Sequence, residues 1–172
     1  MKRTIAVFGL FLLITGYARA QEEGGIRLGA QISYGDAIQG DGIGLGGRAT
    51  WALDDWSKGV AFTTSFDYYF PESEVGADDA SYFELNGNLT YAFVLGNGVS
   101  PFLGAGVNFA RGSHGEEALG FRFEETQSSV GLNLLGGIRF PKPDRRFTPF
   151  AEIKTVLGGD FEPVIVTGGI QF

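Results

Sequence analysis

The sequence predicts an all-β fold, namely an eight-stranded antiparallel up-and-down barrel. Eight segments of the 172-residue chain alternate between apolar and polar residues, and no convincing helical pattern interrupts them. A period of two is typical of a strand that has two unlike faces. The 44% of hydrophobic residues argues against disorder, and the absence of Cys excludes a disulfide scaffold or a thiolate metal site.

The first four segments each have one apolar face. Their apolar residues are Ile26, Leu28, Ala30, Ile32 and Tyr34; Ile43, Leu45, Ala49 and Trp51; Val60, Phe62, Phe66, Tyr68 and Phe70; and Phe83, Leu85, Leu89 and Tyr91. The residues between them are Arg27, Gln31 and Ser33; Arg48 and Thr50; Thr63, Ser65 and Asp67; and Glu84, Asn86, Asn88 and Thr90. We therefore expect one strand in each of the ranges 26–34, 43–53, 60–70 and 83–93.

The last four segments repeat this pattern. Their apolar residues are Leu103, Ala105, Val107 and Phe109; Val130, Leu132, Leu134, Ile138 and Phe140; Ala151, Ile153 and Leu157; and Val164, Val166, Ile170 and Phe172. The opposite faces carry Gly104, Gly106 and Asn108; Gln127, Ser129, Asn133 and Arg139; Thr148, Glu152 and Lys154; and Thr167, Gly169 and Gln171. The expected strands are 103–109, 127–140, 147–157 and 164–172.

The connections between these strands are of two kinds. Those after the second, fourth and sixth strands are short and rich in turn-forming residues: 54–59, 94–100 and 141–146. Those after the odd strands tend to be longer and more acidic: 35–41, 71–80, 111–125 and 158–162. One end of the barrel should therefore consist of tight turns and the other mostly of loops.

Residues 1–20 are predicted to form a secretory signal peptide that is cleaved after Ala20. Lys2 and Arg3 precede a short apolar run, and the segment ends in the small-x-small triplet Ala18-Arg19-Ala20. A membrane anchor is the alternative, but the run of about ten residues is short of the roughly 20 that a spanning helix needs. The barrel domain is then expected to occupy residues 21–172.

The charge balance argues against a nucleic-acid partner. Removal of the signal peptide takes away three basic residues and no acidic ones, which leaves 10 basic and 20 acidic residues and a net charge of −10. Phosphate backbones are bound by clustered Lys and Arg.

The composition of the two faces indicates that the apolar face points outward to lipid. The charged residues of the polar face nearly balance and are separated by small residues, which suits a narrow lumen filled by ion pairs and hydrogen bonds. These predicted lumen charges are Arg27, Arg48, Asp67, Glu84, Arg139, Glu152 and Lys154. Aromatic residues of the apolar face gather toward both strand ends, as in the two interfacial girdles of membrane barrels. The sequence therefore predicts a transmembrane barrel, and a soluble ligand-binding barrel of lipocalin type is the alternative.

Four stretches resemble the small eight-stranded barrels of the bacterial outer membrane. They are PFLGAGV (101–107), GLNLLGGIRF (131–140), TPFAEIK (148–154) and TGGIQF (167–172). This group includes the OmpA transmembrane domain, OmpX, OmpW and the opacity-type proteins. The resemblance implies an integral protein of the bacterial outer membrane, surrounded by lipid and lipopolysaccharide, with a structural or surface-interaction role and no cofactor. An OmpW-like alternative is a narrow channel or an entry path for small apolar molecules.

The resemblance also implies an assembly signal at the end of the last strand. In this family the barrel-assembly machinery reads a terminal Phe, a role that falls here on Phe172 together with Ile170. Thr167 occupies the position where the family usually has Gly, so the match to the signal is partial.

We predict no enzymatic activity. Some barrels of this family modify lipid A, and Ser113, His114 and Glu116 have the residue types of a nucleophile, a base and an orienting acid. Neighbours in sequence rarely converge into a triad, so we interpret His114 as a solvated loop residue. We interpret the acidic residues of the connections likewise, because no spacing matches a defined cation loop. No catalytic, cofactor-binding or metal-binding residue is assigned.

Overall fold

The protein is a single closed barrel of eight antiparallel strands. The computed structural model describes residues 25–37, 40–54, 56–71, 81–93, 95, 98–118, 121–142, 144–158 and 162–172. The strands are β1 (Ile26–Ala37), β2 (Gly40–Ala52), β3 (Val60–Pro71), β4 (Ser81–Ala92), β5 (Ser100–Ala118), β6 (Phe121–Arg139), β7 (Thr148–Leu157) and β8 (Val164–Gln171). The predicted fold class is confirmed. The predicted signal peptide, residues 1–20, lies outside the described residues.

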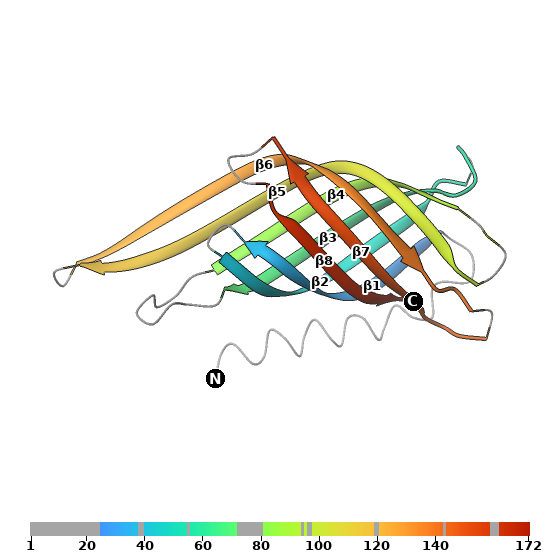
Figure 1. The fold of residues 1–172 in the computed structure, drawn as a ribbon, viewed down its shortest axis with the longest axis horizontal. Helices are drawn as coiled ribbons and strands as arrows, with labels where there is room; N and C mark the ends of the chain where they lie inside the picture. Colours follow the sequence, from blue (N-terminus) through green and yellow to red (C-terminus); the bar gives the residue numbers. More distant parts are fainter. Residues whose placement is uncertain are drawn as a thin grey trace.

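Each strand pairs with its neighbours along the chain, and the pairing of β1 with β8 closes the barrel. The closing ladder runs from the pair Gly29 and Gln171 to the pair Gly35 and Ile165. Closure leaves no edge strand around the barrel wall, so the backbone donors and acceptors there are paired between strands. The strands are strongly tilted relative to the long axis of the barrel (Figure 1). Among the described residues, none lies in a helix of the length and hydropathy needed to cross a membrane.

Tight turns occupy the end of the barrel at which β2, β4 and β6 finish, which we call the short-turn end. After β2, the N–H of Trp56 donates to the carbonyl oxygen of Leu53 at 2.9 Å. The N–H of Leu53 donates to the carbonyl oxygen of Val60, also at 2.9 Å. Gly59 has a φ of +86°, a conformation that favours glycine. This turn geometry explains why the connection after β2 is short.

The prediction for two of the connections was wrong, because strand pairing continues into them. Residues 111–125 were expected to form a loop, but β5 and β6 remain paired up to Ala118 and Phe121. The backbone of His114 pairs there with Glu125, so His114 lies in a strand and not in a loop. Residues 35–41 are also mostly strand, since Ala37 pairs with Gly40. A polar composition is compatible with a strand as well as with a loop. In these two segments the backbone groups pair between the two strands of the hairpin.

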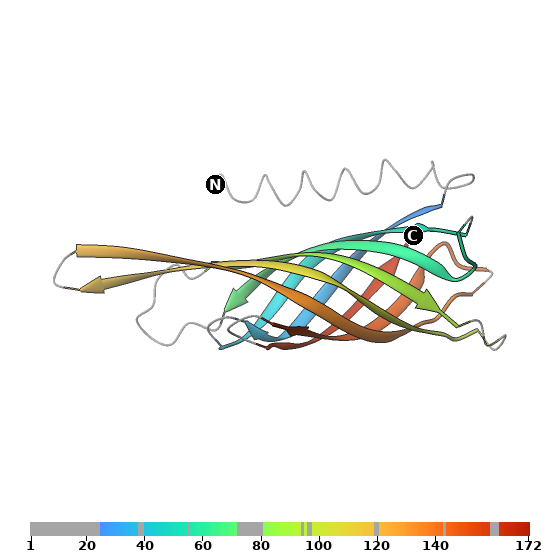
Figure 2. The same cartoon turned by 90° about the horizontal axis from the view of Figure 1, so that it is seen from above.

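The hairpin of β5 and β6 extends far beyond the ends of the other strands (Figures 1 and 2). The ladder between β4 and β5 ends at Ser81 and Ser113, and the ladder between β6 and β7 ends at Leu132 and Leu157. Beyond these pairs, the described part of the hairpin is a two-stranded ribbon. We call this ribbon, at the end opposite the short turns, the protruding hairpin.

The outer face of the barrel is apolar and exposed. Exposed large hydrophobic residues lie on every strand, among them Ile32, Leu45, Phe66, Leu85, Val107, Leu132, Ile153 and Val166. Aromatic pairs on this face lie toward the strand ends. Near the short-turn end, the ring centroids of Trp51 and Phe62 are 5.9 Å apart and those of Tyr91 and Phe93 are 5.0 Å apart. Toward the other end, Tyr68 and Phe70 are 5.1 Å apart. An exposed apolar surface of this extent marks contact with lipid or with another protein.

Candidate functional site

The interior of the barrel is a polar lumen. Six of the seven predicted lumen charges are buried, namely Arg48, Asp67, Glu84, Arg139, Glu152 and Lys154. The seventh, Arg27, is half-buried near the start of β1, where the carboxylate of Asp54 acts on it. The six buried charges come from β2, β3, β4, β6 and β7, and they reach the interior because every second residue of a strand points inward.

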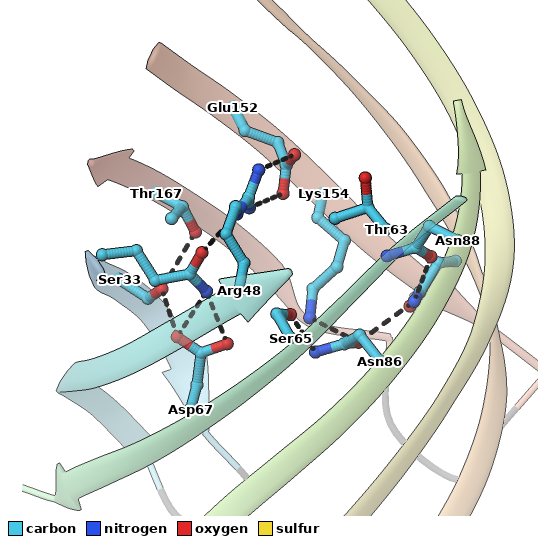
Figure 3. A network of polar contacts seen from close by, with 12 residues as sticks. Ser33, Arg48, Thr63, Ser65, Asp67, Asn86, Asn88, Glu152, Lys154 and Thr167 are labelled. Atoms are coloured by element: carbon cyan, nitrogen blue, oxygen red, sulfur yellow. Dashed lines mark hydrogen bonds and ion pairs between the residues drawn. The ribbon is translucent and has the colours of Figure 1, made fainter. Parts of the chain in front are cut away.

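Arg48 and Glu152 form a bidentate ion pair across the lumen (Figure 3). Two guanidinium nitrogens of Arg48 donate to the two carboxylate oxygens of Glu152 at 3.0 and 3.1 Å. The Nε of Arg48 donates to Gln31 at 2.6 Å, and the amide nitrogen of Gln31 donates to both carboxylate oxygens of Asp67 at 2.8 Å. Ser33 donates a further hydrogen bond to Asp67 at 3.0 Å. One continuous chain of polar contacts therefore links β1, β2, β3 and β7.

A second network is centred on Lys154 and Asn86. The Nζ of Lys154 donates to the Oε2 of Glu84 at 2.6 Å and to the Oδ1 of Asn86 at 3.0 Å. The other carboxylate oxygen of Glu84 accepts a hydrogen bond from the hydroxyl of Tyr82 at 2.7 Å. Asn108 and Asn133 also donate to the Oδ1 of Asn86, at 2.9 and 3.0 Å. Networks of this kind rigidify a buried interior when their groups are satisfied.

Aromatic and aliphatic side chains close the lumen on the side of the protruding hairpin. Tyr69, Tyr82, Ala110 and Ile165 form a buried cluster there, and the rings of Tyr69 and Tyr82 lie 5.1 Å apart. Aromatic rings and aliphatic side chains therefore fill the lumen at this level, next to the hydrogen bond between Tyr82 and Glu84. Together with the buried polar side chains, this cluster favours a filled interior over a narrow channel.

Arg139 lies at the short-turn end and differs from the other buried charges. Its side chain is 4% exposed, and its Nε and Nη2 atoms have no hydrogen-bond partner among the described residues. The guanidinium carbon lies 4.4 Å from the centroid of the Phe102 ring, just as that of Arg48 lies 4.0 Å from the Phe150 ring. Stacking on an aromatic face stabilises a guanidinium group but leaves its N–H edges free.

Two glycines make room for these aromatic rings. A Cβ atom at Gly137 would lie 2.6 Å from the Phe102 ring, and one at Gly169 would lie 2.6 Å from the Phe150 ring. These separations are shorter than van der Waals contact, so each ring occupies space that a larger residue would take. The glycines on the inner face thus allow both arginine–aromatic stacks to fit in a narrow barrel.

The sequence analysis did not predict that aromatic side chains line part of the lumen. Phe102, Phe150, Tyr69 and Tyr82 all point inward and are buried. The signal that would have found them is strand parity, since Phe150 lies two residues before Glu152 and Tyr69 lies two after Asp67. The described residues contain no cluster of three or more acidic or His side chains placed to hold a metal ion.

The proposed assembly residues lie at the short-turn end of the closing strand. Ile170 is exposed on the outer face. The backbone N–H of Phe172 donates to the carbonyl oxygen of Leu28 at 2.7 Å, which extends the contact between β8 and β1.

Comparison with known proteins finds the same fold in several solved structures. No family model matches the sequence, and no curated protein matches it. The structure of Neisserial surface protein A superposes with a TM-score of 0.60 at 16% identity, covering 85% of this chain and 94% of that chain. The N-terminal β-barrel domain of Pseudomonas aeruginosa OprF gives 0.59 at 14% identity, covering 87% and 98%. Ail, the attachment invasion locus protein of Yersinia pestis, gives 0.56 at 17% identity, covering 87% and 96%.

The predicted resemblance is thereby confirmed at the level of the fold. All three structures are small eight-stranded barrels of outer membranes, and each is covered almost completely by this chain. The chain has the fold of the small eight-stranded β-barrels of the bacterial outer membrane.

Proposed function

We propose that this protein is an integral barrel of the bacterial outer membrane that acts in surface interaction or envelope structure and not in catalysis. The observation that carries the proposal is the distribution of side chains around the closed barrel. Large apolar side chains are exposed on the outer face, whereas ion pairs and amides are buried inside. A protein in water would gain nothing from this arrangement, but in a bilayer it places apolar groups in lipid and polar groups among partners.

The protruding hairpin is the element best suited to contact a partner. It is the outer part of β5 and β6, the longest pair of strands in the barrel, and it stands clear of neighbouring strands. Segments outside the bilayer determine which partner a barrel of this kind binds, because the outer face of its wall is in contact with lipid. The names of Neisserial surface protein A and of the attachment invasion locus protein, which share the fold, support a role at the cell surface.

Export and insertion complete the proposal. Residues 1–20 would direct the chain across the inner membrane, and Ile170 and Phe172 would present the closing strand to the barrel-assembly machinery. The partners of the mature wall would be lipid and lipopolysaccharide. We propose no nucleic-acid partner, because the charge of residues 21–172 is strongly negative.

Cysteine labelling on intact cells tests the proposed orientation. The sequence has no native Cys, so single variants can be labelled selectively with a membrane-impermeant maleimide. Thr126→Cys places a thiol at an exposed position at the base of the protruding hairpin, and Ser57→Cys places one at an exposed position of the short turn after β2. We expect labelling of Thr126→Cys on intact cells, and labelling of Ser57→Cys only after the outer membrane is opened.

Two results would contradict this proposal. Labelling of Ser57→Cys alone on intact cells would show the opposite orientation. Labelling of neither variant until the cells are broken would show that the hairpin is not at the surface. Heat-dependent mobility in SDS gels controls for correct folding of both variants.

A further inference from the structure

The short-turn end of the lumen carries an excess of positive charge. The positive charges of Arg27 and Arg48 both repel that of Arg139, and Glu152 is the carboxylate that attracts it. Both terminal guanidinium nitrogens of Arg48 already donate hydrogen bonds to the carboxylate of Glu152. Asp54 acts on Arg27 from the adjacent turn. No described carboxylate accepts a hydrogen bond from the Nε or Nη2 atom of Arg139.

Two unpartnered nitrogen atoms of Arg139 form a fork of donors that can bind two oxygen atoms together. The unpartnered atoms are Nε and Nη2, whose N–H bonds point in the same direction along one edge of the guanidinium plane. This edge matches the spacing of two oxygens in a phosphate or carboxylate group and binds them in a bidentate manner. The ring of Phe102 lies against the guanidinium group and stabilises its position. Gly137 leaves the space that this ring occupies.

A ligand would reach this fork from the short-turn end. Arg139 is the last residue of β6 and pairs with Ser100, the first residue of β5. Arg27, near the start of β1, is only half-buried. On the other side, the cluster of Tyr69, Tyr82, Ala110 and Ile165 separates the site from the protruding hairpin. A ligand of this edge would therefore come from one side of the membrane only, and the site is not part of a passage through the barrel.

We propose that Arg139, supported by Arg27 and Arg48, binds a small oxyanion of the phosphate class at the short-turn end of the lumen. A dianionic phosphate would offset the local excess of positive charge and would use the unpaired edge of Arg139. An unpaired buried cation is strongly unfavourable, so the anion would stabilise the folded barrel as well. The phosphate group can belong to inorganic phosphate or to the headgroup of a lipid.

Titration with inorganic phosphate tests the site. The full chain is folded in an uncharged detergent at constant ionic strength set with chloride, and the Nε–H signal of Arg139 is followed by ¹H–¹⁵N NMR. We expect a saturable shift of this signal. Arg139→Gln should weaken phosphate binding by about tenfold or more, as loss of hydrogen bonds from a charged donor predicts. In that variant, binding is followed through the Nε–H signal of Arg48.

Arg145→Gln is the matched control, because Arg145 also stacks on a phenylalanine, Phe147, but lies exposed in the turn before β7. This variant should bind phosphate as the unaltered protein does. Should Arg139→Gln fail to fold, Arg139→Lys retains the charge but lacks the fork, and it should bind phosphate more weakly than the unaltered protein. The absence of a saturable shift at Arg139, or equal weakening in the variants of Arg139 and Arg145, would overturn the proposal.

A second titration distinguishes the two sources of the phosphate group. A short-chain phosphatidic acid is added below its micelle concentration in place of inorganic phosphate. Saturation of the Arg139 signal at lower concentrations than with inorganic phosphate would identify a lipid headgroup as the ligand. Saturation by inorganic phosphate alone would identify the free anion, and both results support the site.

Discussion

Replacement of Lys154 by Met is expected to destabilise the folded barrel by about 3–5 kcal/mol, because it leaves the carboxylate of Glu84 buried without its cation. Glu84 is 0% exposed, Lys154 is 5% exposed, and their Nζ and Oε2 atoms are 2.6 Å apart. The Lys154 ammonium also donates to Asn86, so that hydrogen bond would be lost as well. Urea-induced unfolding from lipid vesicles measures the free-energy change.

A double-mutant cycle separates the ion pair from the loss of packing. In the Glu84→Gln background the buried negative charge is absent, so Lys154→Met should destabilise much less than it does in the unaltered protein. Lys58→Met, at an exposed position of the turn after β2, is the matched control and should have little effect. Equal effects of Lys154→Met in both backgrounds would show that the two charges are not coupled.

Replacement of Leu132 by Arg is expected to destabilise the protein in lipid by about 2–4 kcal/mol. Leu132 is 60% exposed on the outer face of β6, and a charged side chain near the middle of the bilayer costs about this much. The same substitution would be almost neutral if this face were in contact with water. Reversible folding into lipid vesicles, followed by intrinsic fluorescence, gives the measurement.

Ser128→Arg is the matched control for this prediction. Ser128 lies on the same strand and the same face as Leu132, four residues closer to the protruding hairpin, and it is exposed. Near the edge of the bilayer an arginine costs only about 0–1 kcal/mol. If Leu132→Arg proves as mild as Ser128→Arg, the apolar face does not lie in lipid.

Alternation along the chain was sufficient to predict the barrel, because strand parity alone decides which side chains can meet inside. Arg139 and Asn133 share one parity on β6, and both are buried. The pattern is a local property and needs no knowledge of the neighbouring strands. For the same reason, the alternation indicated a lumen of nearly balanced charge without any knowledge of which charged side chains pair.

The pairing of those charges could not be predicted in this way. Arg48 meets Glu152, 104 residues further along the chain, across the barrel and not along one hairpin. Which residues face each other across a barrel depends on the stagger of all eight strands, and alternation does not encode that stagger. The unpaired state of Arg139 follows from the same geometry, so it too was visible only in the structure.

The protruding hairpin shows a second limit. Its acidic and glycine-containing sequence matched a loop as well as a solvated ribbon, and strand pairing there is decided by backbone hydrogen bonds that the pattern does not report. The prediction of strands was reliable where one face met lipid and the other met the lumen. It was wrong where both faces could meet water.

The most direct test of the lipid-facing barrel is the mobility of the protein in an SDS gel before and after boiling. The full-length chain is expressed in a Gram-negative host, the outer-membrane fraction is isolated, and unboiled and boiled samples are compared. We predict recovery in that fraction and a clear shift on boiling, because a closed barrel with a paired backbone and a buried ionic lumen resists SDS until it is heated. Recovery as a soluble protein with no shift would contradict the account, since it would place the apolar face away from lipid.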